Sequence, residues 1–363
     1  MRVVAAIVHT KGGPFRLREV DLEPPRPREV LVRMSAVGIC HTDLRNRDTW
    51  PGHLLPMVFG HEGTGSVEAV GTAVSHVEVG DTVCLSYNSC GECHSCLNGH
   101  PAYCGSLGLL NSSGGRSDGS SPLSRLGEVV HAGYFGQSSF ATHAIVHERT
   151  VVRVPPDLPP LVAAPLGCSV QTGVGTVLNV LRAQPGTAVL VFGAGSVGMS
   201  AVMGARIAGC SPIIVVEPSP TRRGLALELG ATAAFDPTET NLVTTVEELT
   251  SGGAHCAVDT TGRSDAVRQA IAMLRSTGRV ALVGAGTDLS LDITRLQSRG
   301  ISAQGVIEGD AVAQEFLPKL VEFHRGGQLP VERLTTPFAF EEIEDAAQAA
   351  LAHRVLKPVL MFE

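Results

Sequence analysis

The sequence predicts a two-domain protein of the α/β plus β class, with an antiparallel barrel followed by a doubly wound parallel sheet. The chain has 363 residues, which suits two domains because one domain takes roughly 150 residues. Short β-rich runs separated by glycine and proline fill the first part, whereas strands alternate with helices from about residue 187. The first pattern is typical of an antiparallel barrel or sandwich, and the second of a parallel sheet.

The first part, up to about Arg153, contains short runs of strand-forming residues. Five such runs are Val3–Val8, Phe15–Val20, Val30–Val37, Gly65–Val70 and Asp81–Ser86. A segment rich in glycine and serine, from Gly105 to about Gly127, interrupts this pattern. We expect that segment to be a surface loop, because it lacks apolar alternation.

The second part begins after Pro155 and Pro156, where the pattern changes. Short apolar runs predict buried strands at Val189–Phe192, Ile213–Val216, Ala233–Asp236, Ala257–Asp259 and Val280–Val283. Helices are predicted between the strands at Val197–Ala208, Thr221–Leu229, Leu242–Leu249 and Ala266–Leu274. This alternation predicts right-handed βαβ units around a parallel sheet.

The tail from about residue 307 predicts two helices, Ala311–Arg325 and Glu341–Ala352, and a final strand, Val359–Phe362. The parallel sheet is complete by about residue 306, so the tail is free to return to the first domain. We therefore expect a β-rich domain over 1–168, a parallel-sheet domain over 169–306, and a C-terminal segment over 307–363 that rejoins the first domain.

Composition and charge exclude several classes of protein. The net charge is −7, and nucleic-acid binding needs clustered basic residues instead. The uncharged segment 188–205 contains four glycines, which favours a buried strand and helix over a membrane span. The apolar run Val3–Val8 is too short for an export signal, so we expect a cytoplasmic protein. In that compartment the nine cysteines favour metal binding over disulfides.

Four of the cysteines form the sharpest motif in the sequence, because they follow one another at short spacing. They are Cys90, Cys93, Cys96 and Cys104. Four thiolates complete the tetrahedral coordination of a zinc ion and leave no position for a substrate, which predicts a structural zinc site.

A glycine motif predicts a dinucleotide site. Gly193, Gly195 and Gly198 follow a predicted strand and open a predicted helix, and Glu217 ends the next strand about 20 residues later. In this context the glycines let the backbone approach a pyrophosphate, while the acidic residue accepts hydrogen bonds from the ribose. Glu217 favours NAD, although the nearby arginines keep NADP as the alternative.

Three further metal-ligand residues remain, and each lies beside glycine and strand-like residues: Cys40, His61 and Cys168. Two thiolates and an imidazole would leave zinc one open position, as in catalytic sites. Read alone, the Cys40-His41 pair could also be a nucleophile pair or two neighbours in a loop.

Together these motifs resemble the zinc-dependent medium-chain alcohol dehydrogenases. The resemblance covers essentially the whole chain and rests on the segments 38–43, 60–65, 90–104, 167–168 and 193–198. It implies a GroES-like barrel that holds two zinc ions per chain, a Rossmann domain that binds NAD, and a tail that rejoins the barrel. Segment 135–141 and the loop before it resemble the branch that acts on benzyl, cinnamyl and terpenoid alcohols.

The same resemblance implies the roles of individual residues. Cys40, His61 and Cys168 would bind the catalytic zinc, and Thr42 would take the alcohol proton. Asp43 would brace His61 from behind.

Three further roles follow from the resemblance. Glu62 would lie behind the metal, and His41 and Lys357 would reach the cofactor pyrophosphate. Many relatives have a histidine near the position of Arg45 that ends the proton relay, so here the relay must end on water, on another group or on His41.

The function expected from the resemblance is the reversible oxidation of a primary alcohol, aryl or allylic, to its aldehyde by hydride transfer to NAD. The partners expected are a small-molecule alcohol or aldehyde and further copies of the chain, as a dimer or tetramer. Two alternatives stay open: a formaldehyde dehydrogenase acting on a glutathione- or mycothiol-type adduct, and a zinc-stabilised binding module without catalysis.

Overall fold

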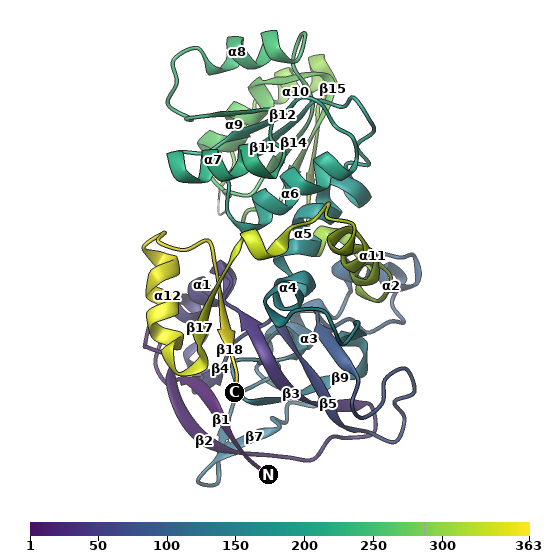
Figure 1. Ribbon diagram of the computed structural model, residues 1–363, viewed down its shortest axis with the longest axis vertical. Helices are drawn as coiled ribbons and strands as arrows, with labels where there is room; N and C mark the ends of the chain where they lie inside the picture. Colours follow the sequence, from purple (N-terminus) through teal and green to yellow (C-terminus); the bar gives the residue numbers. More distant parts are fainter. Residues whose placement is uncertain (287) are drawn as a thin grey trace. The chain divides into compact units, whose positions relative to one another are not determined.

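The computed structural model of the chain describes residues 1–286 and 288–363 and divides them into two compact units (Figure 1). Unit 1 comprises Met1–Cys168, Val312–Glu322 and Val331–Glu363. Unit 2 comprises Ser169–Ala311 and Phe323–Pro330. The first division therefore falls directly after Cys168, and most of the tail lies in unit 1.

Unit 1 contains two β-sheets of mainly antiparallel strands. The first has the order β4-β1-β2-β7-β8, with bounds Met57–Val58, Arg2–Val8, Arg16–Leu22, Leu123–Arg125 and Glu128–Val130. The second has the order β10-β6-β5-β3-β18-β17, with β9 also paired to β3. Its strands span Val151–Arg153, Thr82–Leu85, Gly63–Val70, Glu29–Gly38, Lys357–Met361, Thr335–Ala339 and, for β9, His143–His147.

The C-terminal strand β18 joins the second sheet next to β3. The two strands are antiparallel, with Val359 opposite Gly38 and Leu360 opposite Val37. Figure 1 shows this strand, in yellow, beside the purple strand β3. The pairing brings Lys357 close to the end of β3, where Cys40 follows.

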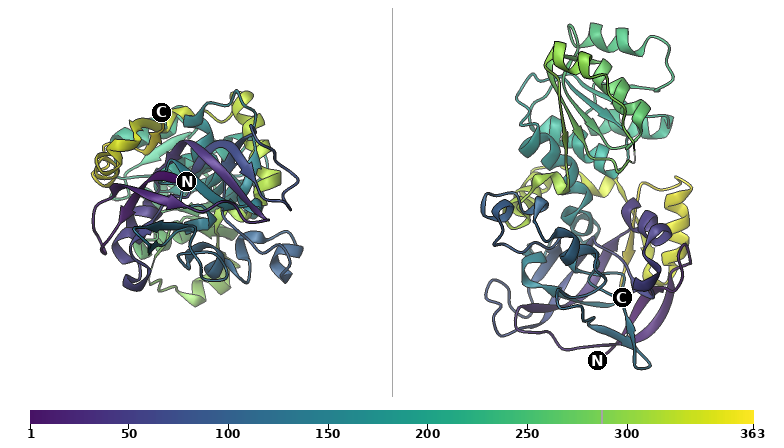
Figure 2. Two further views of the ribbon diagram at one scale, coloured as in Figure 1. Left: turned by 90° about the horizontal axis from the view of Figure 1, so that it is seen from below. Right: turned by 180° about the vertical axis from the view of Figure 1, so that it is seen from behind.

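Short helices complete unit 1. They are α1 (His41–Thr49), α2 (His94–Leu97), α3 (Leu107–Ser112), α4 (Pro160–Ala163), α11 (Ala313–Arg325) and α12 (Ile343–Leu351). Helix α11 belongs to unit 1 as far as Glu322. Figure 2 shows the same elements from below and from behind.

The expectation of a surface loop over 105–127 is wrong for two parts of the segment. Leu107–Ser112 form α3, and Leu123–Arg125 form β7, which pairs with β2. Asn111 is 3% exposed, and its side-chain amide bonds with both backbone groups of Asn88. Glycine and serine allowed tight turns here, but they do not show whether the segment between the turns is buried.

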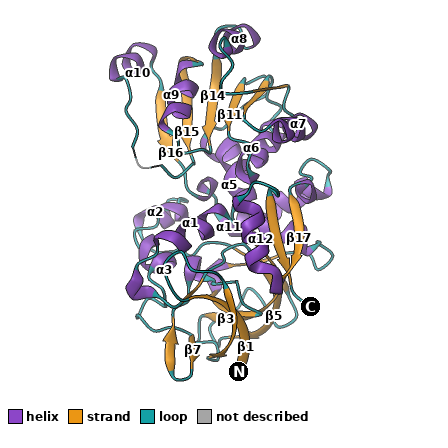
Figure 3. Cartoon of the chain, turned by 90° about the vertical axis from the view of Figure 1, so that its left-hand side faces the viewer, coloured by secondary structure: helices purple, strands orange, loops and turns teal. Residues whose placement is uncertain are grey.

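Unit 2 is built on a six-stranded parallel sheet with the order β13-β12-β11-β14-β15-β16. The strands, in chain order from β11 to β16, span Val189–Phe192, Ile213–Val216, Ala233–Phe235, Ala254–Asp259, Leu274–Leu282 and Ser302–Gly305. The helices are α5 (Ser169–Gly175), α6 (Ser196–Ile207), α7 (Pro220–Leu229), α8 (Leu242–Leu249), α9 (Ser264–Ala272) and α10 (Ile293–Arg299). Figure 3 shows helices on both sides of these strands.

The central strand β11 explains why the sheet forms here. Its four residues are at most 1% exposed, and burying a large apolar side chain contributes about 1.5–3 kcal/mol. The predicted fold class, a GroES-like barrel with a doubly wound Rossmann domain, is confirmed. Helix α10 and strand β16 were not predicted. For β16 the reason is that all four of its residues are exposed and form no apolar run.

No single helix in the described part of the chain is long and apolar enough to cross a membrane. One bent pair, Pro160–Gly167 and Ser169–Val180, reaches the required length and composition only when its two helices are counted together.

Candidate functional site

Four buried side chains with metal-ligating atoms come together in unit 1. The ligand atoms of Cys40, His61, Glu62 and Cys168 all lie within 4.8 Å of one another. Cys40 follows the end of β3, His61 and Glu62 immediately precede β5, and Cys168 follows the 3-10 helix Ala164–Gly167. Sheet pairing and a tight helical turn thus bring together residues that are more than 100 positions apart.

Asp43 connects the backbone at Cys40 to the backbone at Gly60. Its carboxylate is fully buried and accepts hydrogen bonds from the backbone N–H groups of Cys40, at 2.9 Å, and Gly60, at 3.2 Å. The same carboxylate lies 2.8 Å from Nδ1 of His61. The first bond also caps α1, since the third residue of the helix turns back to the residue before its start.

The imidazole of His61 is oriented by that contact. Because Nδ1 faces a carboxylate, the proton is assigned to Nδ1 and the lone pair to Nε2. Nε2 is buried and has no hydrogen-bond partner among the residues that the structure describes. Burial alone would lower the pKa of His61, but the Asp43 carboxylate and the Cys40 sulfur together raise it well above its usual value, so a metal ion at Nε2 would bind in competition with a second proton. A buried lone pair beside two thiols fits a metal ion.

A neighbouring thiol and a nearby positive charge favour the ionised form of Cys40. The hydrogen bond with Cys168, aided by the charge of Lys357, holds the pKa of Cys40 well below its usual value despite burial. A thiolate is the form of cysteine that binds metals. Two thiolates and one neutral imidazole are the donor set of a catalytic zinc site with one open position, so the residues present fit zinc.

Glu62 and Lys357 form a buried ion pair beside this cluster. Nζ of Lys357 lies 2.8 and 2.9 Å from the two carboxylate oxygens of Glu62, and it also donates to the carbonyl oxygen of Ile39. Burial raises the pKa of Glu62, and Lys357 opposes that rise. Gly38 leaves room for the carboxylate, because a Cβ there would collide with Oε2 of Glu62.

The role expected for Lys357 at a cofactor pyrophosphate stays a prediction. The residue is 1% exposed, and its ammonium group is held by Glu62 and Ile39. No sequence pattern predicts the contact with Glu62, because Lys357 lies 295 positions from Glu62.

His41, Thr42 and Arg45 lie in the first turns of α1. His41 and Arg45 are exposed, and Thr42 is partly buried. The carbonyl oxygen of Thr42 accepts a hydrogen bond from Oη of Tyr134 at 3.4 Å, and Asn46 donates to the same Oη at 2.7 Å. The first turn of α1 is therefore anchored beside Asp43.

Aromatic rings surround the imidazole of His61. The ring of Phe135 stacks on it with centroids 4.4 Å apart, and Tyr134 meets it edge-on at 5.5 Å. Trp50 and Phe59 pack edge-to-face against Tyr134. Trp50 is 6% exposed, and its Nε1 has no hydrogen-bond partner among the described residues. Trp50 therefore packs in a hydrophobic core of unit 1.

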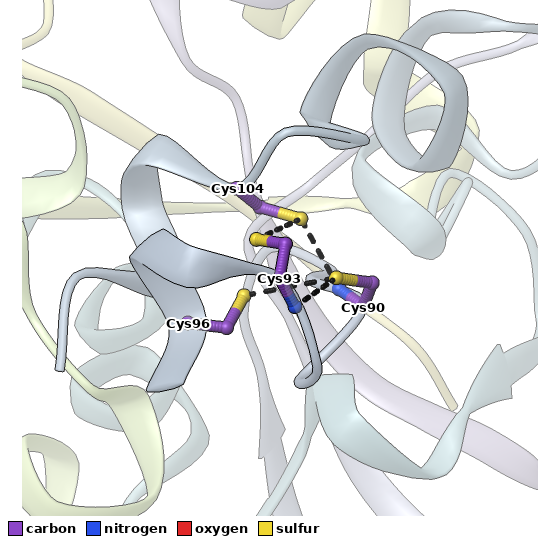
Figure 4. Close-up of side chains that lie close together, drawn as sticks. All are labelled: Cys90, Cys93, Cys96 and Cys104. Atoms are coloured by element: carbon purple, nitrogen blue, oxygen red, sulfur yellow. Dashed lines mark hydrogen bonds between the residues drawn. The ribbon is translucent and has the colours of Figure 1, made fainter. Parts of the chain in front are cut away.

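The second cluster consists of the four closely spaced cysteines (Figure 4). Sγ of Cys90 lies 3.9 Å from Sγ of Cys96, and the sulfurs of Cys93 and Cys104 are also 3.9 Å apart. Two sulfurs 2.3 Å from a shared tetrahedral zinc would lie about 3.8 Å apart, whereas a disulfide needs about 2.05 Å. None of the nine cysteines, all of which are described, forms a disulfide.

Backbone N–H groups face these sulfurs and favour their ionised forms. Gly105 donates to Sγ of Cys93 at 3.4 Å, and this contact lowers the pKa of Cys93 to about 6. Burial opposes this effect at Cys96 and raises its pKa to about 12. This cluster fits a closed, structural zinc site.

The glycine turn of unit 2 connects β11 to α6. Gly198 packs against the carbonyl group of Gly193, because a Cβ on Gly198 would collide with that oxygen. Glu217 is 4% exposed and accepts hydrogen bonds from the backbone N–H groups of Ala194, at 2.7 Å, and Ser219, at 3.0 Å. The carboxylate at the end of β12 is thereby fixed beside the turn.

Arg223 is engaged near this carboxylate. It donates to the carbonyl oxygens of Glu217 and Pro218 and pairs with Asp236 at 3.0 Å. Its guanidinium group is therefore committed to acceptors in unit 2.

Gln137 lies beside the cluster of Cys40, His61 and Cys168, and it was not predicted as a functional residue. Its buried amide bonds to the carbonyl oxygen of His61. Segment 135–141 contributed only a resemblance to one branch of a family. A glutamine between glycine and serine forms no motif that would predict a site residue.

Comparisons with known proteins agree with this geometry. Residues 26–156 match the family model of the alcohol dehydrogenase GroES-like domain, and residues 196–324 match that of the zinc-binding dehydrogenases. A geraniol dehydrogenase of Castellaniella defragrans is 44% identical over 363 residues, which cover 99% of this chain and 97% of that protein.

Two crystal structures are similar over the whole chain. An alcohol dehydrogenase zinc-binding domain protein from Burkholderia ambifaria has a TM-score of 0.97 and 43% identity, covering 100% of this chain and 99% of that one. The benzyl alcohol dehydrogenase from Acinetobacter calcoaceticus has a TM-score of 0.96 and 38% identity, covering 100% of both chains.

Proposed function

Because the chain belongs to the zinc-dependent medium-chain alcohol dehydrogenases, in the aryl and terpenoid alcohol branch, we propose that it oxidises a primary alcohol reversibly to its aldehyde with NAD. The observation that carries the proposal is the buried cluster of Cys40, His61 and Cys168, in which Nε2 of His61 has no partner among the described residues. These three residues would hold one zinc ion and leave one position for the alcohol oxygen.

In the proposed alcohol oxidation, zinc and NAD would supply the reactive groups, and residues of the chain would hold and orient them. Zinc supplies a Lewis acid that lowers the pKa of the alcohol, and NAD supplies the hydride acceptor. Thr42, in the first turn of α1, would accept the alcohol proton. Asp43 keeps the imidazole of His61 in the tautomer that presents Nε2. Four thiols at Cys90, Cys93, Cys96 and Cys104 would hold the second zinc.

Unit 2 supports NAD as the cofactor. The turn over Gly193, Gly195 and Gly198 would take the pyrophosphate at the start of α6. Glu217 would accept hydrogen bonds from the ribose and repel a 2′-phosphate, and Arg223 is already committed to Asp236. His41 is exposed and would contact the pyrophosphate.

An aryl or allylic substrate agrees with two observations. The partly buried ring of Phe135 stacks on His61, and flat unsaturated alcohols pack well on aromatic faces. Relatives are named as geraniol and benzyl alcohol dehydrogenases.

We also propose that the chain forms a homo-oligomer, either a dimer or a tetramer. Its location in the cytoplasm stays a prediction.

A panel of alcohols tests the proposal. The purified protein is mixed with benzyl, cinnamyl, geraniol-type and short aliphatic alcohols, with NAD or NADP, and absorbance is followed at about 340 nm without added thiol. We expect turnover with aryl or allylic alcohols and NAD, and metal analysis should find about two zinc ions per chain. Activity only on formaldehyde with added thiol would support the thiol-adduct enzyme instead. One zinc and no NAD binding would support a non-catalytic module.

Replacing Glu217 by alanine should weaken the preference for NAD. A hydrogen bond to a charged group contributes about 1.5–3 kcal/mol, so the ratio of kcat/KM for NAD to that for NADP should fall at least tenfold. Glu248→Ala removes an exposed carboxylate from the same unit and should leave the ratio unchanged. An unchanged ratio in Glu217→Ala would assign cofactor selection to other residues.

A further inference from the structure

Gln137 lies at the centre of a buried hydrogen-bond network. Its side chain is 2% exposed, and Nε2 donates to the carbonyl oxygens of His61, at 3.0 Å, and Ser86, at 2.9 Å. Oε1 accepts from the backbone N–H of Gly63, at 3.2 Å, and from the hydroxyl of Ser139, at 3.3 Å. Both donors and both acceptor positions of the amide are used, which also fixes its orientation.

Ser86 extends this network toward Cys168. The hydroxyl of Ser86 is fully buried and donates to the carbonyl oxygen of Gly167 at 2.8 Å. Gly167 directly precedes Cys168. A continuous path of hydrogen bonds therefore runs from the backbone of His61, through Gln137 and Ser86, to the residue before Cys168.

The turn that carries Gln137 is held in a strained conformation. Phe135 and Ser138 have φ angles of 51° and 54°, and a residue other than glycine in the left-handed region costs about 1–3 kcal/mol. The hydroxyl of Ser138 stabilises the turn by donating to Val58 at 2.6 Å and accepting from the N–H of Tyr134. The same turn places the ring of Phe135 on the imidazole of His61.

We propose that Gln137 is a positioning residue for the zinc centre formed by Cys40, His61 and Cys168. Its amide fixes the backbone of His61 directly and that of Cys168 through Ser86, so that an imidazole and a thiolate stay at the separation that one ion requires. This inference rests on the proposed zinc site. Asp43 fixes the ring of His61, and Gln137 fixes its main chain.

Zinc release from three variants tests the inference. Gln137→Met keeps the length of the side chain and removes all four hydrogen bonds, and Ser86→Ala removes the hydroxyl that bonds to Gly167. Asn111→Leu is the matched control, because Asn111 is an equally buried amide of unit 1 whose bonds go to Asn88 and Leu107. Purified, zinc-loaded protein is mixed with a colorimetric chelator, and the release of the two ions is followed over time.

Losing an outer hydrogen-bond partner of a metal ligand typically weakens binding 10- to 100-fold. In Gln137→Met we expect the ion of the Cys40 site to leave about tenfold faster or more, with the four-cysteine ion unchanged. Ser86→Ala should shift release in the same direction by less, and Asn111→Leu should leave the Cys40 site unchanged.

A spectroscopic measurement separates positioning from general loss of stability. Cobalt is exchanged into the Cys40 site, and the thiolate-to-cobalt absorption bands are recorded together with the melting temperature. The bands should shift in Gln137→Met and stay in place in Asn111→Leu, even where both variants melt earlier. If Gln137→Met does not fold, Ser86→Ala carries the test alone.

The possible failures are distinguishable. If the unchanged protein releases only one zinc ion per chain, the proposed function is wrong. If it releases two, but Gln137→Met and Ser86→Ala match it in release rate and cobalt bands, the positioning role of Gln137 is overturned.

Discussion

Replacing Cys168 by alanine should abolish alcohol oxidation and leave about one zinc ion per chain, whereas replacing Thr42 by valine should reduce the rate and keep both ions. In a well-built site zinc lowers the pKa of bound water from about 15.7 to about 7. A similar shift for an alcohol would be worth roughly 12 kcal/mol, at 1.36 kcal/mol per unit. Proton transfer to a positioned side chain contributes about 10²–10⁴ in rate, or about 3–5 kcal/mol. Loss of the metal ligand should therefore have much the larger effect.

Cys84→Ala is the matched control for this comparison. Cys84 is also a fully buried cysteine of unit 1, and burial raises its pKa to about 12, so it stays a neutral thiol. Its Sγ bonds to the carbonyl oxygen of Ala163, outside both metal clusters. The variant should keep two zinc ions and most of the activity. Steady-state rates and metal content are measured for the three variants. The loss of activity should be larger in Cys168→Ala than in Thr42→Val, and equal residual rates in these two variants would contradict this expectation.

Replacing Lys357 by methionine should destabilise the protein by about 3–5 kcal/mol, the usual cost of removing one partner of a buried ion pair. The change leaves the carboxylate of Glu62 fully buried without its ammonium partner. Since total stability is about 5–15 kcal/mol, the midpoint of urea unfolding should fall clearly. We expect the double variant Glu62→Gln with Lys357→Met to recover part of the loss, because no uncompensated charge remains.

Unfolding is followed by circular dichroism on zinc-loaded protein, with metal content measured for each variant. Lys319→Met removes an exposed lysine from α11 and should leave the midpoint nearly unchanged. If the double variant is no more stable than Lys357→Met, the loss comes from packing, and charge pairing between Glu62 and Lys357 is not its cause.

The sequence by itself determined the parts of this protein that depend on short spacing. Four cysteines within 15 positions and three glycines between a strand and a helix are brought together by one loop and one turn. Few bonds separate these residues, so the chain has little freedom to place them elsewhere. Strands β11 and β12 of the parallel sheet were also located from the sequence, because each is an uninterrupted apolar run.

Only the tertiary structure decided the contacts that depend on strand register over long distances. Lys357 meets Glu62 because β18 pairs antiparallel with β3, with Val359 opposite Gly38. Gln137 meets the carbonyl group of His61 because a strained turn returns beside the start of β5. A register shift of one residue in β18 would turn the side chain of Lys357 to the other face of the sheet, and neither this register nor the path of the turn at Gln137 is recorded in the local sequence.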